Sequence, residues 1–356
     1  LGFGLGYMVK YFVEKIANVK KTDQILIIEK DPEIFRIALT LEDITPLIMN
    51  PHVVFMVGEK EEDLFTNFVE YFRTALRIVY LKSIESIYHP SSIILDKAYY
   101  LGALTKLRES SVFALKFYGN DPEDSLIGIE NMLDNILEIV KNPGINLLYD
   151  EFKGKPAIIA STGPSLNKNK HLLKGLEDKA LIIAPDASLK PLLEIGVKPH
   201  MITALERVEM TVKLVQGFKE EEVRDVYYAA SPIVRKEAYE AYPGPDHFKW
   251  LGIERGILDI KHSSGNMAFK LAHALGCDPI ILIGQDLAYS REGKTHASGT
   301  TLGEMQESSN RFRKFEVMGN DGQPILTNET WNEFRQAYQL DIKEFNGKCI
   351  NCTEGA

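Results

Sequence analysis

Cysteine, tryptophan and long apolar runs are scarce in this sequence. It has three cysteines and two tryptophans among 356 residues, and so few cysteines exclude a disulfide scaffold. No stretch approaches the ~18 consecutive apolar residues that a membrane span requires, and no basic segment followed by an apolar run indicates a secretory signal. We therefore expect a cytoplasmic protein without a membrane span.

An excess of positive charge is also lacking. Lys and Arg total 41 and Asp and Glu total 50, which gives a formal net charge of −9. Nucleic-acid binding needs a basic face, so this balance argues against a nucleic-acid partner. Apolar residues make up 45% and charged residues 26%, which is typical of globular proteins. At roughly 150 residues per domain, the length suggests about two domains.

The first part of the chain alternates short apolar runs with amphipathic stretches. Residues 24–30 and 52–57 have the length and branched composition of buried strands, and residues 77–81 could form a third. Asp31 and Pro32 are typical of an N-cap and first turn, which predicts a helix ending at Leu41. The pattern predicts an N-terminal Rossmann-like domain over residues 1–90.

The next part of the chain has apolar residues at helical spacing, and a second block of alternating strand and helix patterns follows it. Apolar residues recur at helical intervals in 95–110 and 121–142, so we predict a helical linker over residues 91–150. Repeated strand–helix units after Lys155 predict an α/β domain with a parallel, doubly wound sheet over residues 151–356. The strand candidates of this block are PAIIAS, ALIIAPD, HMITALE, DVYYAAS, FKWLG, PIILIGQD and CINCTE.

Polar or small residues follow most of these strands. Because ligands of open parallel sheets bind beyond the carboxyl ends of the strands, the clustering predicts a site at that edge. Any one of these residues could simply cap the next helix, but their joint placement favours a site. The residues are Ser161, Thr162 and Gly163, then Asp186, Glu206 and Ser231, then Gln285 and Asp286, and finally Asn351, Thr353 and Glu354.

Two segments combine a strand end or turn with the start of a helix. STGPSL at 161–166 offers a glycine that lets a ligand approach the backbone and Ser165 as a helix cap, a combination typical of a phosphate or anion seat. HSSGNMAFKLAHALG at 262–276 places Ser263, Ser264, Gly265 and Asn266 at another helix N-terminus. The alternative for the second segment is an ordinary serine cap on a helix of small residues.

Of the three segments, GQDLAYSREGKTHASG at 284–299 is the least typical of a simple connecting loop. Asp286 stands at a strand end, Tyr289 follows three residues later, and His296 follows a turn-rich loop. A tyrosine hydroxyl can donate to a departing phosphate, and a histidine can accept a proton near neutral pH. The alternative is that His296 is only a solvated loop residue.

The N-terminus carries a glycine run, LGFGLGY at 1–7, and Glu29 ends the next predicted strand about 20 residues later. This spacing resembles the opening of a Rossmann methyltransferase-like domain, in which such an acid grips a ribose. The strand that should precede the glycines is absent from the chain. A retained fold without a retained ligand is therefore as strong an interpretation as a working cofactor site.

The sequence does not indicate a dedicated metal site. Cys349 and Cys352 form one Cys-x-x-Cys pair, but structural zinc needs four ligands and no second pair exists. No Asp-x-Asp pair or helical His-x-x-x-His occurs. We expect no metal and no resident cofactor.

Taken in order and spacing, LGFGLGY, IASTGPSL, HSSGNMAFKLAHALG, GQDLAYSREGKTHASG and NCTEGA resemble the motility accessory factors, the Maf flagellin glycosyltransferases. The resemblance spans essentially the whole chain. The central domain of that family is similar to metal-independent bacterial sialyltransferases with a GT-A-like sheet. The resemblance implies cytoplasmic transfer of sialic, pseudaminic or legionaminic acid from a CMP-sugar substrate to Ser or Thr of flagellin, in support of flagellum assembly.

The resemblance also implies roles for individual residues. Departure of the CMP phosphate would be assisted by Tyr289, and the acceptor proton would be taken by His296, Asp286 or Glu354, in that order of preference. The residues that would bind the CMP-sugar are Thr162, Gly163, Pro164, Ser165, Asp186, Glu206, Ser263, Ser264, Gly265, Asn266 and Gln285.

The chain departs from the family pattern at two places. The sialyltransferases keep a base histidine after the tyrosine loop, whereas RFRKFEVMGNDGQPILTN here contains none. The final Glu-Gly-Ala is one glycine short of the run that usually leads into a helical C-terminal domain. Two alternatives stay open: an enzyme similar to 6-hydroxymethylpterin diphosphokinase that uses ATP and magnesium, and a flagellin-binding protein without chemistry.

Overall fold

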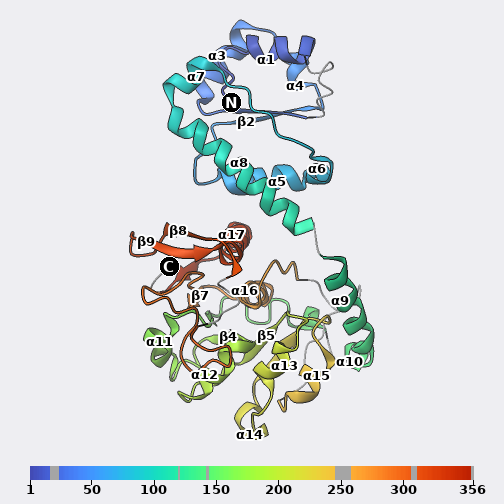
Figure 1. Cartoon of the computed structure of the whole chain (residues 1–356), viewed down its shortest axis with the longest axis vertical. Coiled ribbons are helices and arrows are strands. Elements are labelled where there is room, and N and C mark those ends of the chain that lie inside the picture. The colour runs from blue at the N-terminus through green and yellow to red at the C-terminus, as the bar shows by residue number, and fades with distance from the viewer. Residues whose placement is uncertain (17–23, 119–120, 142–143, 245–257, 306–310, 354–356) are drawn as a thin grey trace. The chain divides into compact units, whose positions relative to one another are not determined.

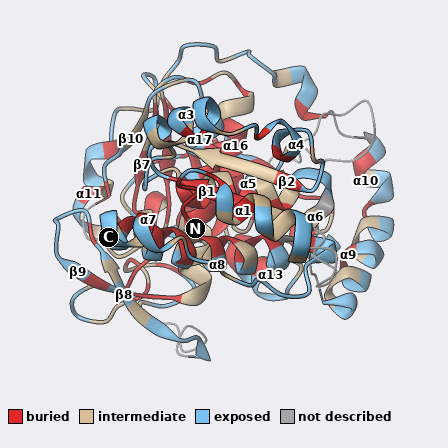
Figure 2. Cartoon of the chain, turned by 90° about the horizontal axis from the view of Figure 1, so that it is seen from above, coloured by how far each residue is buried: buried red, intermediate tan, exposed pale blue. Residues whose placement is uncertain are grey.

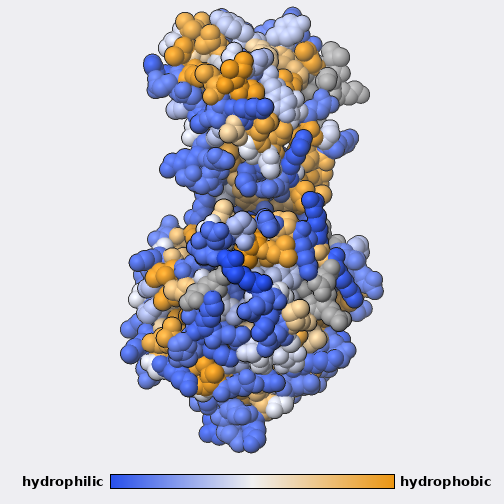
Figure 3. All heavy atoms as spheres, turned by 60° about the vertical axis from the view of Figure 1, so that its left-hand side comes forward, coloured by the Kyte–Doolittle hydropathy of each residue, from blue (hydrophilic) through white to orange (hydrophobic). Residues whose placement is uncertain are grey.

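The computed structural model describes residues 1–16, 24–118, 121–141, 144–244, 258–305 and 311–353 (Figure 1). The chain divides into two compact units, Leu1–Asn120 and Asp121–Ala356, and each is described by itself. Among the described residues, no helix is both long enough and apolar enough to cross a membrane. On the face drawn in Figure 3, hydrophilic residues predominate and apolar residues form separate patches.

The first unit is built around two parallel strands, β1 (Ile25–Glu29) and β2 (Val53–Val57), which pair in register from Ile25 with Val53 to Glu29 with Val57. Between them, α3 (Pro32–Leu41) begins as predicted, because the Asp31 carboxylate accepts the Glu33 N–H at 2.8 Å. The other helical segments are α1 (Tyr7–Tyr11), a π-helical turn (Phe12–Ile16), α4 (Thr45–Ile48), α5 (Leu64–Arg73), a 3₁₀ turn (Thr74–Leu76), α6 (Arg77–Tyr80), α7 (Pro90–Leu95) and α8 (Lys97–Tyr118).

The predicted third strand at 77–81 is wrong. Arg77–Tyr80 forms α6, in which Ile78 is buried while Val79 and Tyr80 are exposed. A short apolar run fits either a strand or a buried helical turn, and here burial of a single side chain stabilises the helical turn. The described residues of this unit therefore contain a two-stranded parallel sheet.

Residues 91–150, predicted as one helical linker, are divided between the two units. Helices α7 and α8 belong to the first unit, where Tyr100, Ala103 and Leu107 of α8 share a core with Leu64 and Phe68 of α5. Helices α9 (Pro122–Asp134) and α10 (Ile136–Lys141) belong to the second. The helical character of the segment was predicted from its spacing, but which core each helix joins depends on long-range packing.

The second unit contains a six-stranded sheet with the order β10-β7-β3-β4-β5-β6, and all of its pairings are parallel. This confirms the predicted α/β class with a parallel sheet. The strands are β3 (Ala157–Ala160), β4 (Leu181–Pro185), β5 (Met201–Ala204), β6 (Tyr227–Ala230), β7 (Ile280–Ile283) and β10 (Cys349–Asn351). The candidate strand FKWLG lies outside the described residues.

The order of these strands creates a topological switch point between β3 and β7. The chain proceeds from β3 outward through β4 and β5 to β6, then returns to place β7 on the other side of β3. The loops that leave β3 and β7 therefore run in opposite directions. Such a topological switch point is where open α/β sheets bind their ligands.

Helices cover both faces of the sheet. The buried helix α16 (Ser264–Ala274) packs on β3, β4, β5 and β7. The sequence interpretation had not identified the antiparallel hairpin of β8 (Lys314–Met318) and β9 (Pro324–Asn328) or the long helix α17 (Glu329–Glu344). The remaining segments are short: α11 (Leu166–Asn169), α12 (Leu189–Leu193), α13 (Met210–Val215), α14 (Glu220–Val223), α15 (Lys236–Ala241), and 3₁₀ turns at Ile145–Leu148, Lys170–Leu173 and Asp186–Ser188.

Candidate functional site

The turns that follow β3 and β7 lie in direct backbone contact. The Gly163 N–H donates to the Gly284 carbonyl at 2.7 Å, and the Ser161 N–H donates to the Ile283 carbonyl at 2.9 Å. A Cβ on Gly163 would lie 2.4 Å from the Gly284 oxygen, and one on Gly284 would lie 2.3 Å from the Ser161 oxygen. Gly163 was predicted to let a ligand approach the backbone. In the structure, glycine is required at this position because the two turns approach each other so closely.

Ser165 and Asp286 meet at the same place. The Ser165 N–H donates to Asp286 Oδ2 at 2.6 Å, and both side chains are more than nine-tenths buried. Within the described residues, Ser165 Oγ and Asp286 Oδ1 have no hydrogen-bond partner. Burial raises the pKa of Asp286 to about 6, against the lowering effect of the neighbouring Ser165. Buried polar atoms without partners are costly, so this pair is suited to a hydrogen-bonding ligand.

Gln285 links three elements around the switch point between β3 and β7. Its Oε1 accepts hydrogen bonds from Ser161 Oγ at 2.5 Å and from the Tyr338 hydroxyl of α17 at 3.0 Å. The N-terminal turn of α16 also closes on it, because a Cβ on Gly265 would lie 2.7 Å from Gln285 Oε1. Tyr338 was missed, because nothing in its local sequence connects it with a strand end 53 residues earlier.

At the start of α16, the Ser263 side chain forms the serine cap that was the alternative to a binding role. Ser263 Oγ accepts the Asn266 N–H at 3.1 Å and donates to Asn266 Oδ1 at 2.8 Å. Asn266 is fully buried, and its amide donates to the Phe334 carbonyl at 3.5 Å. Its side chain is thus paired within the protein. The first N–H groups of the helix, at Ser264 and Gly265, are the donors that a helix N-terminus offers to an anion.

A buried ion-pair network joins the segment before α16 to α17. Lys261 Nζ lies 2.6 Å from Asp341 Oδ1, with both side chains fully buried, and Lys270 Nζ lies 3.0 Å from Glu344 Oε2. Burial raises the pKa of Asp341 to about 6, although Lys261 acts in the opposite direction. The network holds the segment before α16 against α17, a helix that was not predicted from the sequence.

Asp186, in the turn directly after β4, lies in a second buried polar environment. Its Oδ1 accepts the Ala187 N–H at 2.8 Å, and burial with a contribution from the Glu206 carboxylate raises its pKa to about 7. The buried Tyr228 hydroxyl and Ser188 Oγ have no hydrogen-bond partner among the described residues. Glu206 itself is exposed. The structure thus brings the predicted Asp186 and Glu206 into one electrostatic environment.

Tyr289 lies in the loop after β7 and is almost completely buried. Its ring centroid is 4.7 Å from that of Trp331, and Lys314 Nζ lies 4.4 Å from the Tyr289 ring centroid. The hydroxyl accepts a hydrogen bond from Asn328 Nδ2 at 3.4 Å. The β8–β9 hairpin and α17 therefore hold this side chain, and they place a cation beside it.

His296 lies next to the turn after β3, because the N–H of the following Ala297 donates to the Thr162 carbonyl at 2.8 Å. The Thr295 hydroxyl donates its proton to the Glu304 carbonyl at 3.0 Å, so the Thr295 oxygen must accept from His296 Nδ1 at 2.9 Å. This assigns the proton to Nδ1 and leaves Nε2 as the acceptor. Burial lowers the pKa of His296 to about 4, so the ring is neutral at pH 7.

Other predicted positions are placed as follows. Thr162 and Pro164 lie in the turn with Gly163, and Glu354, the third base candidate, lies outside the described residues. A surface cavity of about 500 Å³ lies beside α12 and α13 and is lined by Lys190, Lys213, Phe218 and Thr301 among others. None of its lining residues is a predicted site residue. Within the described part of the chain, no three His, Cys, Asp or Glu side chains form a candidate metal cluster.

In the first unit, Glu29 and the glycine run bind each other. Glu29 Oε2 accepts the N–H groups of Phe3 at 2.7 Å and Gly4 at 3.3 Å, and Oε1 accepts from Asp31 N–H at 3.0 Å and the Tyr100 hydroxyl at 2.8 Å. The carboxylate is 1% exposed. Its acceptor positions are therefore used by the protein itself.

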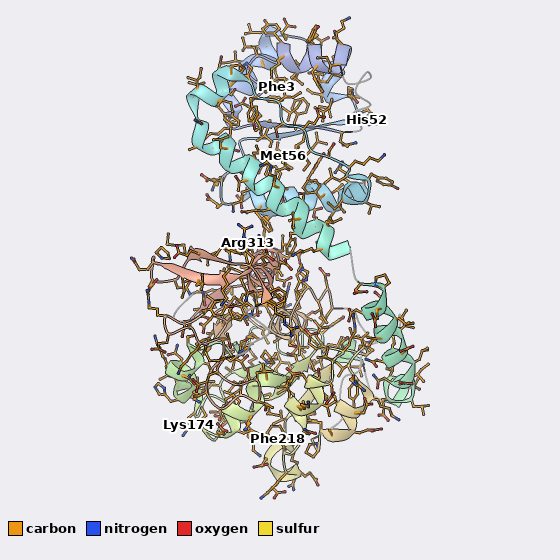
Figure 4. The ribbon with its side chains drawn as sticks, in the orientation of Figure 1. Phe3, His52, Met56, Lys174, Phe218 and Arg313 are labelled. Carbon is orange, nitrogen blue, oxygen red and sulfur yellow. The ribbon has the colours of Figure 1, made fainter. Side chains whose placement is uncertain are left out.

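Side chains of the first unit also fill the space beside its glycines. A Cβ on Gly4 would lie 2.4 Å from the His89 ring, and one on Gly6 would lie 2.7 Å from the Phe3 ring. Phe3, labelled in Figure 4, packs against Phe35 and Phe55. These contacts account for the glycines by internal packing, and a pocket of about 340 Å³ lies beside Glu29, Asp31 and Tyr100.

The second unit thus has a Rossmann-like α/β architecture, with polar groups at its switch point. The whole chain has the fold of a solved structure described as a Maf glycosyltransferase from Magnetospirillum magneticum AMB-1, with a TM-score of 0.57 and 18% sequence identity. The similarity covers 100% of this chain and 55% of that chain. The predicted resemblance to the Maf proteins is confirmed at the level of the fold, over about half of that protein's length.

Residues 130–292 match a family model described as 6-hydroxymethylpterin diphosphokinase MptE-like. This match covers α10, β3 through β7 and the loop that carries Asp286 and Tyr289. No curated protein matches the sequence.

Proposed function

We propose that this protein is a cytoplasmic glycosyltransferase that moves a nonulosonic acid from a CMP-sugar to a Ser or Thr hydroxyl of flagellin, by metal-independent inverting displacement. The observation that carries the proposal is the polar cluster at the β3–β7 switch point of a chain with the Maf fold. There, Ser165 Oγ and Asp286 Oδ1 are buried beside a glycine turn, and neither has a hydrogen-bond partner among the described residues. A nucleotide sugar would supply the missing hydrogen bonds.

In this proposal the nucleotide binds across the switch point between β3 and β7. The N–H groups of Ser264 and Gly265 at the α16 N-terminus face the phosphate, because a helix N-terminus favours negative charge. Ser165 Oγ and Asp286 Oδ1 hydrogen-bond the ribose hydroxyls. Tyr289, with Lys314 beside its ring, lies on the side from which the CMP phosphate departs.

The chemical step needs one base and one leaving group. The acceptor hydroxyl oxygen forms a bond to the anomeric carbon as the bond from that carbon to the phosphate oxygen breaks, and the bonding electrons leave with CMP. His296 Nε2 takes the hydroxyl proton. The Nδ1–H tautomer leaves a free lone pair on Nε2 at pH 7, and burial makes this nitrogen a weaker base than that of a free histidine.

A second candidate is a diphosphokinase that uses ATP and magnesium. The match to the MptE-like model favours it, together with the carboxylates of Asp186 and Glu206, which are close enough for Glu206 to raise the pKa of Asp186. Magnesium is commonly held by one or two carboxylates and the substrate phosphates. In that enzyme, Asp186 and Glu206 would hold the ion.

Calorimetric titration with CMP and CTP, and with ATP with and without magnesium, separates these functions. We expect CMP to bind without magnesium, and Ser165→Ala and Asp286→Asn each to weaken binding about 10-fold, since each loses a hydrogen bond of ~1–1.5 kcal/mol. Asp225→Asn, at an exposed position of the same unit, is the control. Binding of ATP alone and only with magnesium would replace the proposal with the diphosphokinase. No binding of any nucleotide would favour the flagellin-binding protein without chemistry.

A further inference from the structure

Helices α9 and α10 attach to the second unit through polar contacts. Asn131 Nδ2 donates to the Ile233 carbonyl at 2.8 Å, and Asn135 Nδ2 donates to the carbonyls of Pro232 at 2.9 Å and Val234 at 2.7 Å. Asn135 is fully buried. The inner face of the two helices is therefore held by amide side chains on a backbone segment that follows β6.

The same inner face is completed by a glycine and an arginine. A Cβ on Gly128 would lie 3.0 Å from Arg207 Nε, and the Arg207 guanidinium forms an ion pair with Asp124. Gly128, Asn131 and Asn135 recur at intervals of three and four residues, so they form one helical row. This row faces the domain; it is polar along α9 and continues in α10 to the buried Ile139.

The opposite face is apolar and exposed. At 3.6 residues per turn, intervals of three and four place its six residues along one stripe. Figure 2 shows α9 and α10 at the edge of the view with mostly exposed colouring. The stripe consists of Leu126 (55% exposed), Ile129 (50%), Leu133 (60%), Ile136 (51%), Leu137 (67%) and Val140 (64%). We call these six residues the outer stripe.

This arrangement is the reverse of an ordinary surface helix. An amphipathic helix normally packs its apolar face on the core and turns its polar face to solvent. Here the polar row is buried and the outer stripe is exposed. A contiguous apolar patch on a protein surface marks an interaction site, and its helical spacing fits a partner helix with apolar residues at similar intervals.

One border of the outer stripe is acidic. Glu123, Glu130 and Asp134 are exposed, and the 100° per residue of an α-helix places them beside the stripe on one side. None of the three forms an ion pair with a described residue. Residues 121–140 contain no Lys or Arg. A second copy of this face would bring carboxylates to carboxylates, so charge complementarity selects a basic partner.

We propose that the outer stripe binds an amphipathic helix of a protein partner, with Lys or Arg residues along one border of that helix. The apolar contact supplies the affinity, and the acidic border fixes which side of the partner helix faces Glu130 and Asp134. The proposal rests on this face alone and is independent of the reaction proposed at the β3–β7 switch point.

The test uses the full chain and two designed, fluorescently labelled helical peptides with the same leucine stripe, one bordered by lysines and one by glutamates. We expect the lysine peptide to bind at least about 10-fold more tightly in fluorescence anisotropy and to weaken as salt is raised. Leu133→Ser with Leu137→Ser should reduce its binding at least about 10-fold, because the outer stripe loses apolar contact area. Leu115→Ser, at an exposed apolar residue of α8 outside the stripe, should leave binding unchanged.

Charge reversal provides a second test that does not depend on loss of binding. Glu130→Lys with Asp134→Lys should transfer the preference from the lysine peptide to the glutamate peptide. Equal binding of both peptides, or binding unaffected by the leucine substitutions, would overturn the proposal. A dimer in sedimentation equilibrium that Leu133→Ser with Leu137→Ser converts to a monomer would overturn it in favour of a second copy.

Discussion

Replacing His296 with glutamine is expected to slow sugar transfer at pH 7 by about 100-fold or more, because a positioned base contributes 10²–10⁴-fold. Glutamine keeps a polar group of similar size but cannot accept the acceptor proton. CMP affinity should remain within about two-fold, since His296 acts on the acceptor rather than on the nucleotide. His171→Gln, at an exposed histidine, is the matched control and should leave the rate unchanged.

The pH dependence gives this prediction a second readout. The pKa of His296 is lowered to about 4 by burial, so the ring keeps its free lone pair on Nε2 as the pH falls from 7 toward 5. At saturating CMP-sugar, protonation of His296 should therefore slow the reaction only as the pH approaches 4, whereas titration of Asp286 near pH 6 acts on nucleotide binding. An unchanged rate for His296→Gln, with wild-type pH dependence, would remove His296 as the base.

Replacing Gly163 with alanine is expected to destabilise the second unit by about 1–3 kcal/mol, the usual effect of overpacking. The new Cβ would lie 2.4 Å from the Gly284 carbonyl oxygen and 2.5 Å from Asp286 Oδ2. One of these contacts is backbone, so relief requires the turns after β3 and β7 to separate. Their separation also moves Ser165 away from Asp286, and we expect CMP affinity to fall at least about 10-fold.

Urea unfolding and CMP titration of the same preparations measure both effects. Gly102→Ala is the control, because its Cβ would meet only the flexible end of Glu61 at 3.3 Å and alanine suits the interior of α8. Gly163→Ala with wild-type stability and wild-type CMP affinity would show that the two turns do not form the nucleotide site.

The edge of the sheet where the site lies could be predicted from the sequence. Apolar strands bounded by small or polar residues indicated a parallel sheet, and parallel strands present their carboxyl ends at one edge. This rule alone placed Gly163 and Asp286 near each other across 123 positions of sequence. Their direct contact confirms the inference about position, whereas the roles of the individual side chains remain predictions.

Other parts of the site depended on packing between distant elements. Tyr338 contacts Gln285 through α17, and the buried pair of Lys261 and Asp341 joins segments 80 residues apart. Neither has a local pattern that marks it. Arg77–Tyr80 has a local pattern, but the pattern is ambiguous. A short apolar run is compatible with a strand or a helical turn until the elements that pack against it are known.

The glycine run illustrates how one pattern can have two physical causes. Glycines followed by an acid at a strand end are typical of a nucleotide site, since glycine admits a ligand and the acid binds a ribose. In this unit the same residues are needed for internal packing. His89 and Phe3 occupy the space beside Gly4 and Gly6, and Glu29 accepts hydrogen bonds from the turn itself.

The measurement that tests the central claim most directly is the intact mass of flagellin after incubation with the full chain and a CMP-activated nonulosonic acid, with no added metal. The account predicts a mass increase of one or more nonulosonic acid residues on flagellin, with one CMP released for each sugar transferred. It also predicts a much smaller increase with His296→Gln. Flagellin of unchanged mass, together with an intact CMP-sugar bound to the protein, would contradict it.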